Sequence, residues 1–492
     1  MARVLIIGGG VAGLTAGIYA RKYGHEAVII ERHVTAGGNL TGWKRGGYLI
    51  DNCVHWLTGT NPASSEYKIW CENGALGDVE IRRSDSLYTC EVAGERLSLY
   101  RDLDRVERRM LAISPEDERE IRSFTKAVRD IQGFIGIAGE SHSQKSSLFA
   151  KICAIPTVAK YFKLTTGDLG RRFSHPLLRE FFSSFFTDRF GAFALLFVIA
   201  HYCGDNADLP AGGSVAMAKR MKDRFLSLGG ELLLGREAVK VNLEGSRATS
   251  VRLADGSELS ADYVILTTDP ATTFGKLIDR EMPRELKAKY KDHRLMRFSS
   301  YQCAFKCDLP TVPFESDICF DLPYKYRVRL CTMNLVVREF SHEPSFSPDG
   351  CNILQTMTFC DERMARRFIE KRASDKADYD RRKRYLGEWI RRAMIEKMPE
   401  LDGHIELIDV WTPASYRRFV GSDIGSYMSF VFSKNVAPLA SGSRIKGLKN
   451  VLLATQWQQA PGGLPIAAEL GKRAAELINK LAKPSRKAKC PT

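Results

Sequence analysis

Residues 3–31, with the sequence RVLIIGGGVAGLTAGIYARKYGHEAVIIE, decide the fold of this chain. An apolar segment leads directly into a glycine-rich turn, a helix-forming segment follows as far as Gly24, and a second apolar segment ends at Glu31. Two strands joined through a helix lie parallel to one another, and strands buried on both faces of a sheet read as continuous apolar runs. The sequence therefore predicts an α/β fold with a parallel sheet.

The turn carries the spacing G-x-G-x-x-G at the point where the strand enters the helix. In this motif Gly8 permits the tight turn, Gly10 lets the backbone approach a pyrophosphate, and Gly13 allows close packing of helix on strand. The predicted phosphate-binding loop comprises Gly8, Gly10, Val11, Ala12 and Gly13. A carboxylate at the end of the second strand accepts hydrogen bonds from ribose hydroxyls, so Glu31 argues against the 2′-phosphate of NADP. These features predict a Rossmann-like dinucleotide-binding domain.

A second pair of glycines follows soon after Glu31. Arg32 precedes the run Ala36-Gly37-Gly38-Asn39, which resembles the extension found in FAD enzymes of the glutathione reductase and amine oxidase type. We therefore predict FAD as the cofactor, with contacts from Arg32, Gly37, Gly38 and Asn39. No second G-x-G-x-x-G follows a predicted strand, so the flavin is expected to exchange electrons with an external donor or acceptor.

Composition sets the broad class. The chain has 492 residues, of which 44% are hydrophobic and 27% charged, as in ordinary globular proteins. The longest uninterrupted apolar stretch, residues 190–200, is shorter than the roughly 20 residues that span a bilayer. The first residues lack the pattern of a secretory signal, so we expect a cytoplasmic protein. The net charge of +15 favours an anionic partner, but no nucleic-acid-binding motif accompanies it, and we expect none.

The 12 cysteines contain no C-x-x-C pair. The closest two, Cys303 and Cys307, have no matching pair or histidines beside them, whereas metal sites need such ligands at close spacing. We therefore predict no metal site and, in a reducing compartment, free thiols.

Later segments supply further parts of a nucleotide domain. Residues 209–214 precede an amphipathic helix, and segments 238–243, 249–253 and 261–267 are predicted to form a β-meander with a turn at Asp255-Gly256. A strand over 450–455 enters a second glycine-rich turn before a helix at about 466–481. Because a helix start stabilises negative charge, we predict contacts to the flavin pyrimidine edge here. The residues concerned are Gln456, Gly463, Leu464 and Pro465.

The order of these elements resembles the flavin-dependent phytoene desaturase, carotenoid isomerase and retinol saturase superfamily over nearly the whole chain. The matching features are the N-terminal motif, residues 209–213 before a helix, Asp269-Pro270 after a strand, residues 341–345, Thr412-Pro413 with Tyr416, and residues 461–465. Two positions depart from the pattern of many relatives. Thr455-Gln456-Trp457 stands where they carry Gly-Asp, and Cys53 replaces a glycine.

The resemblance implies two domains. Residues 1–75, 203–270 and 425–492 would form the FAD-binding domain, with backbone contacts from Val239 to the adenine. Residues 76–202 and 271–424 would form a discontinuous α+β substrate-binding domain above the flavin. The implied activity is that of an FAD-dependent oxidoreductase that removes, adds or rearranges C=C bonds in a long apolar polyene or isoprenoid. Two alternatives share the architecture: a flavin amine oxidase, and a non-enzymatic binder like the Rab GDP-dissociation inhibitors.

His55 is the predicted catalytic residue, because the stretch around it approaches the flavin in relatives and an imidazole can transfer a proton to a substrate carbon. A hydrogen-bonded structural histidine is the alternative. Cys53 and Gln456 are expected beside the flavin without an assigned role.

Two further segments each have two interpretations. Phenylalanines between 181 and 197 recur at spacings of 3 and 4, as on one side of a helix, and either pack in the core or line an apolar tunnel. The basic, partly apolar segment 145–172 either contacts a membrane surface peripherally or presents a solvated charged face, and Pro156 is expected to break any continuous helix there. The basic residues from Lys480 to Lys489 are expected to form a disordered tail.

Overall fold

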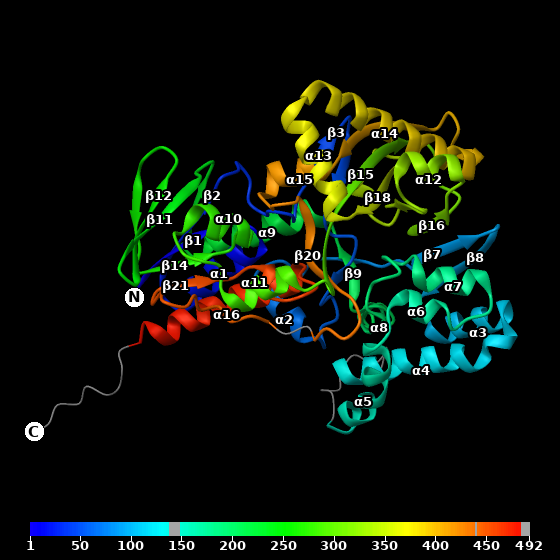
Figure 1. Ribbon diagram of the computed structural model, residues 1–492, viewed down its shortest axis with the longest axis horizontal. Helices are drawn as coiled ribbons and strands as arrows, with labels where there is room; N and C mark the ends of the chain where they lie inside the picture. Colours follow the sequence, from blue (N-terminus) through cyan, green and yellow to red (C-terminus); the bar gives the residue numbers. More distant parts are fainter. Residues whose placement is uncertain (137–147, 438–439, 484–492) are drawn as a thin grey trace, which may run out of the picture.

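The computed structural model describes residues 1–136, 148–437 and 440–483 (Figure 1). Its first layer is a five-stranded parallel sheet in the order β10-β2-β1-β14-β21. The strands are β1 (Arg3–Ile7), β2 (Glu26–Glu31), β10 (Glu231–Leu234), β14 (Tyr263–Leu266) and β21 (Val451–Leu453). This arrangement confirms the predicted α/β fold with a Rossmann-like sheet.

The two faces of the parallel sheet are covered differently. Val4 and Ile6 share one apolar cluster with residues of α1 (Val11–Lys22), α9 (Gly213–Ser227) and α16 (Leu464–Leu481). Leu5 and Ile7 point the opposite way, because side chains alternate along a strand, and cluster with residues of a three-stranded antiparallel sheet. Burial on both faces explains the uninterrupted apolar sequence of β1.

That antiparallel sheet is the predicted meander, with one change. Its strands are β11 (Ala238–Glu244), β12 (Arg247–Leu253) and β13 (Glu258–Ser260). The turn between β12 and β13 falls at Asp255-Gly256, where Gly256 has a φ of +87°. The segment 261–267, expected as the third strand of the meander, instead supplies β14 of the parallel sheet. Its run Tyr263–Leu266 is apolar throughout, as a strand buried on both faces requires.

The second half of the fold is built on an eight-stranded mixed sheet. Its order is β19-β15-β18-β17-β16-β7-β8, and β20 also pairs with β15. The strands are β7 (Ser86–Val92), β8 (Glu95–Tyr100), β15 (Leu295–Cys307), β16 (Asp317–Asp321), β17 (Asn334–Glu339), β18 (Asn352–Cys360), β19 (Ile405–Trp411) and β20 (Ser426–Phe432). In Figure 1 the helices α12 (Tyr324–Leu330), α13 (Glu362–Ser374) and α14 (Lys376–Lys397) cover its outer side. β20 thus joins the second sheet, although it lies within the segment predicted to belong to the FAD-binding domain.

Shorter elements complete the two halves. The small strands are β3 (Gly42–Arg45), β4 (Tyr48–Asp51), β5 (Leu57–Thr58), β6 (Ile81–Arg82) and β9 (Ala207–Pro210). The other helices are α2 (Ser65–Glu72), α3 (Leu103–Ile113), α4 (Glu118–Ile135), α5 (Leu148–Phe162), α6 (Thr166–Gly170), α7 (Pro176–Ser183), α8 (Ala192–Tyr202), α10 (Pro270–Thr272), α11 (Arg284–Lys291) and α15 (Pro413–Val420). Single turns are η1 (Pro115–Asp117), η2 (Thr273–Leu277), η3 (Pro344–Phe346), η4 (Pro399–Leu401) and η5 (Gln456–Gln458).

Helix α5 corrects one expectation. It runs continuously through Pro156, which was predicted to break it. Proline leaves the carbonyl four residues earlier, that of Ile152, without its helical hydrogen bond. The side chain of Ile152 is 55% exposed, so this turn of the helix faces water, which can replace the lost bond. Within the described ranges, no helix is long and apolar enough to cross a membrane.

Candidate functional site

A cavity of about 720 Å³ lies where the loops of the parallel sheet meet the second sheet. This volume falls within the range of small-molecule and cofactor sites. All of the predicted site residues line it except Gly13 and Val239. The structure therefore brings together residues that are separated by more than 400 positions in the sequence.

The phosphate-binding loop forms one end of the cavity. Gly10 caps α1 with a φ of −75°, and a Cβ added there would stand 3.8 Å from the nearest protein atoms, at ordinary van der Waals distance and without a clash. Gly13 does not face the cavity, because an added Cβ would lie 1.9 Å from the carbonyl oxygen of Gly8. Gly10 thus leaves room for a ligand at the helix start, while Gly13 permits the strand and the helix to pack closely.

Glu31 is held at the end of β2 by two backbone groups. Its carboxylate accepts hydrogen bonds from the N–H of Gly9 at 2.7 Å and from the N–H of His33 at 2.9 Å. Each carboxylate oxygen keeps a further lone pair that can accept from a ribose hydroxyl. Val239 does not line the cavity, but Glu237 and Ala238, immediately before it in the chain, do.

The second glycine pair lies against the first. Gly37 donates its N–H to the carbonyl of Gly9 at 2.8 Å, and Gly37 and Gly38 both have positive φ. Arg32 is held away from the cavity centre, because its guanidinium donates to the carbonyls of Arg418 and Phe419 at 3.0 and 2.8 Å.

Asn39 faces the same cavity with one unused group. Its Nδ2 donates to the carbonyl of Tyr427 at 3.2 Å, whereas its Oδ1 is buried without a hydrogen bond among the described residues. A buried acceptor without a protein partner is satisfied by an ordered water molecule or by a bound ligand. The residues at this end therefore fit a dinucleotide cofactor.

The second glycine-rich turn closes the opposite wall. Gln456 accepts a hydrogen bond from the N–H of Gly463 at 2.9 Å through its Oε1. Helix α16 begins directly afterwards, at Leu464 and Pro465. A Cβ added at Gly463 would meet nothing within 4 Å, so the backbone of this turn is open to the cavity.

Asp51, at the end of β4, fixes the loop that carries Cys53 and His55. Its carboxylate accepts from the N–H and the hydroxyl of Ser214 at 2.6 and 2.5 Å, and from the N–H groups of Cys53 and Val54 at 3.0 and 3.1 Å. Burial nevertheless raises the pKa of Asp51 to about 6. No role for this aspartate was predicted from the sequence. Burial also raises the pKa of the Cys53 thiol, which therefore stays protonated.

His55 projects into the cavity with Trp56 beside it. Its Nε2 is buried and has no hydrogen-bond partner among the described residues. Burial and the nearby Arg338 guanidinium lower the pKa of His55 well below its ordinary value. The imidazole is therefore neutral at physiological pH and can accept a proton.

Aromatic side chains form the apolar wall. The phenylalanines between 181 and 197 do not lie on one helix, because α7 ends at Ser183 and α8 begins at Ala192. Phe181 and Phe182 are buried in the core at 2% and 0% exposure. Phe185, Phe186, Phe190, Phe193 and Phe197 line the cavity. Both predicted roles are thus found, divided between the two ends of the segment.

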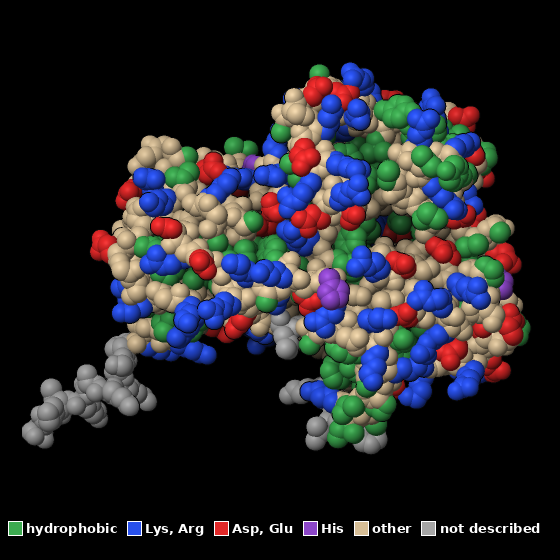
Figure 2. All heavy atoms as spheres, in the orientation of Figure 1, with side chains coloured by type: hydrophobic (Ala, Val, Ile, Leu, Met, Phe, Trp, Pro, Cys, Tyr) green, Lys and Arg blue, Asp and Glu red, His purple; other side chains and the backbone are tan. Residues whose placement is uncertain are grey.

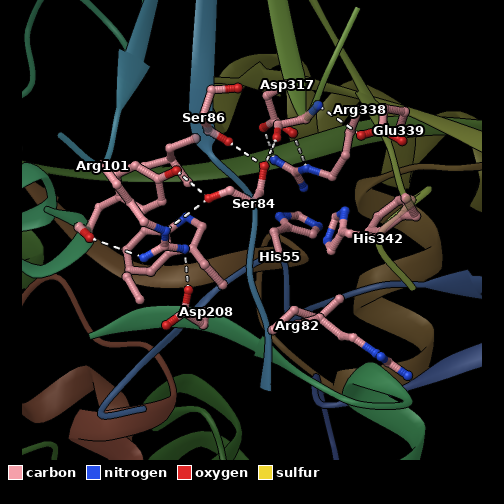
Figure 3. A pocket seen from close by; sticks show the side chains of 17 residues that line it. His55, Arg82, Ser84, Ser86, Arg101, Asp208, Asp317, Arg338, Glu339 and His342 are labelled. Atoms are coloured by element: carbon pink, nitrogen blue, oxygen red, sulfur yellow. Dashed lines mark hydrogen bonds and ion pairs between the residues drawn. The ribbon is translucent and has the colours of Figure 1, made fainter. Parts of the chain in front are cut away.

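A charged wall was not foreseen. Arg338 on β17 forms an ion pair with Asp317 on β16, and both line the main cavity. With His55, Trp56 and Leu87 they also border a smaller polar chamber (Figure 3). These residues come from separate segments without a shared motif, so no sequence signal brings them together.

The basic segment 145–172 is partly neutralised. Lys160 donates to Ser123 at 2.8 Å, Arg171 pairs with Asp168 at 2.6 Å and Arg172 lies 3.4 Å from Glu120. Lys151 and Lys163 are exposed, whereas Lys145 lies outside the described residues. Ile152 and Ile155 on α5 are 55% and 61% exposed. Figure 2 shows hydrophobic side chains gathered over this helix, with Lys and Arg around them. The predicted disordered tail was to begin at Lys480, but Lys480 lies in the last turn of α16; residues 484–489 of that tail lie outside the described residues.

Comparisons with known proteins identify the family of this chain. Residues 11–293 match the model of the family "Flavin containing amine oxidoreductase". The chain is 22% identical to a chloroplastic prolycopene isomerase of Daucus carota, over 86% of this chain and 71% of that protein. It is 21% identical to a lycopene-forming phytoene desaturase of Pseudescherichia vulneris, over 97% and 99%.

Among solved structures, cyclohexylamine oxidase from Brevibacterium oxydans superposes with a TM-score of 0.59 at 14% identity, over 97% of this chain and 99% of that one. This likeness shows the fold. The relation to carotenoid desaturases and isomerases confirms the resemblance found in the sequence. Because the family model covers more than half of the chain, the protein belongs to the flavin-containing amine oxidoreductase family.

Proposed function

We propose that this protein is an FAD-dependent oxidoreductase that acts on C=C bonds of a long apolar substrate, a polyene or an isoprenoid. One observation carries the proposal: a single cavity joins the glycine loop before α1 to a wall of phenylalanines. The names of the relatives, prolycopene isomerase and phytoene desaturase, support substrates of this class.

The residues at the nucleotide end would hold FAD. The start of α1 would bind the pyrophosphate next to Gly10, and Glu31 would accept from the ribose. Asn39 Oδ1, buried without a partner, would accept a hydrogen bond from the cofactor. Gln456, Gly463 and Leu464 would border the flavin at the start of α16. When bound, FAD supplies the two-electron oxidation or reduction of the substrate, with hydride as the transferred species.

His55 would move the proton. A neutral imidazole is a proton acceptor, and the lowered pKa of His55 keeps it neutral. Removal of a proton from a substrate C–H accompanies loss of hydride from the adjacent carbon when a double bond forms. Desaturation is the direction that we propose, with His55 as the proton acceptor; saturation would use the same group in its protonated form.

The phenylalanine wall would exclude water and hold the chain of the substrate. Phe186 lies with its ring centre 4.1 Å from that of Phe359, so two separate segments form a continuous aromatic surface. Helix α5, with Ile152 and Ile155 exposed beside Lys151, would contact a membrane surface from which an apolar substrate enters. An external acceptor would take the electrons from the reduced flavin.

The test has two stages. The absorption spectrum of the purified protein should show a bound flavin, whereas a binder of the Rab GDP-dissociation inhibitor type would be colourless. Incubation with a panel of polyenes, unsaturated lipids, enones and amines, followed by mass spectrometry, should give a product two mass units lighter from a polyene. Oxidation of an amine and of no polyene would instead establish the amine oxidase alternative.

A further inference from the structure

A polar chamber of about 40 Å³ adjoins the main cavity. His55, Trp56, Leu87, Asp317 and Arg338 belong to the walls of both. Figure 3 looks into this chamber: dashed lines join Arg338 to Asp317, and the side chains of His55 and His342 lie between that pair and Arg82. A site that holds a water molecule needs about 10–15 Å³, so the chamber has room for about three waters or one small polar group.

The carboxylates of the chamber are already satisfied. Asp317 accepts two hydrogen bonds from Arg338. Glu339 accepts from the backbone N–H of Ser316 at 2.9 Å and from that of Ser341 at 2.5 Å. Asp208 accepts from Arg101 and from the hydroxyl of Thr60, the latter at 3.1 Å.

Two nitrogens in the chamber, by contrast, make no hydrogen bond. Among the described residues, the Nε2 of His55 and the Nε of Arg82 are buried without a hydrogen bond. The guanidinium of Arg82 is ion-paired, since its Nε lies 3.5 Å from Glu343 Oε2 and its Nη1 donates to Glu80. A guanidinium Nε–H can only donate, and an imidazole nitrogen donates in one of its tautomers. Among the described residues, the Nε–H of Arg82 therefore has no hydrogen-bond acceptor. An oxygen atom of a bound molecule could accept this hydrogen bond.

The surrounding surface makes a purely hydrocarbon occupant unfavourable. The ion pair of Arg338 and Asp317 stands on the wall of a cavity that is otherwise largely aromatic and aliphatic. A hydrocarbon pressed against that pair would remove its water without replacing the hydrogen bonds, which costs free energy. A polar end group in the chamber would avoid that loss while the rest of the molecule lies along the phenylalanines.

We propose that this chamber binds an oxygen-bearing end of the substrate, a carboxyl, carbonyl or hydroxyl group, so that the substrate is amphipathic and enters with its polar end toward Arg82, while His55, which borders both cavities, faces the reacting part of the chain. This inference rests on the proposed function only for the long apolar part of the substrate. The chamber then sets which end of the chain is bound and how far the reacting carbons lie from it.

Ligand affinity tests the proposal without turnover. All-trans-retinoic acid, all-trans-retinol and the corresponding methyl-ended hydrocarbon differ only at one end. Their dissociation constants follow from the rise in unfolding temperature with ligand concentration. We expect the wild-type protein to bind the acid or the alcohol at least about tenfold more tightly than the hydrocarbon, since hydrogen bonds to charged donors are strong.

Arg82→Met removes the donors and keeps the stem, and should abolish this preference. Arg108→Met is the control: it removes the same charge from a side chain that is 68% exposed, and neither Arg108 nor its ion-pair partner Asp102 lines the chamber. The control should keep the preference. Arg82→Gln, which keeps a polar side chain without the charge, provides a second variant if Arg82→Met does not fold, and should weaken the preference.

Two results would overturn the inference. Equal affinity of the wild-type protein for all three ligands would show that the chamber does not recognise an oxygen. An equal weakening of all three by Arg82→Met would show that it holds water only. If no polyene binds, the proposed substrate class fails, and palmitic acid, hexadecanol and hexadecane are compared in the same assay. A preference for the oxygenated members there supports the chamber independently, and no preference refutes it.

Discussion

Replacement of Gly10 by valine tests the cofactor site directly. Gly10 has a φ of −75°, a value that any L-residue can adopt. A Cβ at this position would stand 3.8 Å from Gly37 O and from Gly38 Cα, which is ordinary van der Waals contact. The variant should therefore fold, with its two methyl groups filling the space at the start of α1 where a pyrophosphate would lie.

The size of the effect follows from linkage. A ligand that binds only the folded protein stabilises it by about 4 kcal/mol when its free concentration is 1,000 times its dissociation constant. If Gly10→Val prevents FAD from binding, this whole increment disappears. The stability of the protein without cofactor should change little, because the added side chain meets no clash.

The assay compares flavin content and unfolding in three proteins. The wild type and Gly275→Val, a control in an exposed turn where an added Cβ meets nothing within 4 Å, should retain FAD and melt later when FAD is added. Gly10→Val should purify without flavin and show no shift. A folded Gly10→Val protein with stoichiometric FAD would refute the placement of the cofactor at this loop.

Three further predictions concern other parts of the molecule. His55→Ala should slow desaturation by about 10²- to 10⁴-fold while the flavin content stays the same. The wild-type rate should stay constant as the pH falls through 6.5, because the lowered pKa keeps His55 neutral there. An unchanged rate in the variant would show that His55 has only a structural role. Lys151→Glu combined with Lys163→Glu should reduce the fraction of protein that sediments with anionic liposomes, since each basic residue near such a surface contributes about 1 kcal/mol. High salt should reduce the sedimentation of the wild type in the same way. Equal sedimentation of the variant and the wild type would show that these lysines form only a solvated surface. Asp51→Asn should lower the free energy of unfolding by about 1–3 kcal/mol, because an amide nitrogen would face the N–H of Ser214, and urea titration would detect it; an unaltered midpoint would contradict this role.

The parallel sheet was predictable because its evidence is local. The apolar run of β1, the glycine spacing and the acid at the end of β2 all fall within 31 residues, and each follows from backbone geometry. The turn at Asp255-Gly256 was found for the same reason. The strand over 261–267 was placed in the wrong sheet, because turn signals locate a strand but do not identify its hydrogen-bonding neighbours.

The site was only half visible in the sequence. Glycines and helix starts mark a phosphate site, but the pairing of Arg338 with Asp317 depends on which strands adjoin in the second sheet. Asp51 looked ordinary because its partner, Ser214, lies 163 residues away. The break predicted at Pro156 was wrong because helix propensity is a property of an isolated helix. In the folded protein, packing and hydration of the exposed turn also determine whether the helix continues.

The use of both ends of the chain in one sheet bears on how the protein is made. Strand β21 pairs with β14 beside β1, and α16 packs so tightly on α1 that a Cβ at Gly471 would lie 2.3 Å from the carbonyl of Ala12. Strand β1 and helix α1 leave the ribosome more than 400 residues before β21 and α16, so they must wait for these partners. Until then the apolar face of α1 is exposed, and the part of the proposed FAD site that the turn before α16 forms is missing. Chaperone protection during synthesis, and rapid degradation of chains that stop before Val451, follow from this order of assembly.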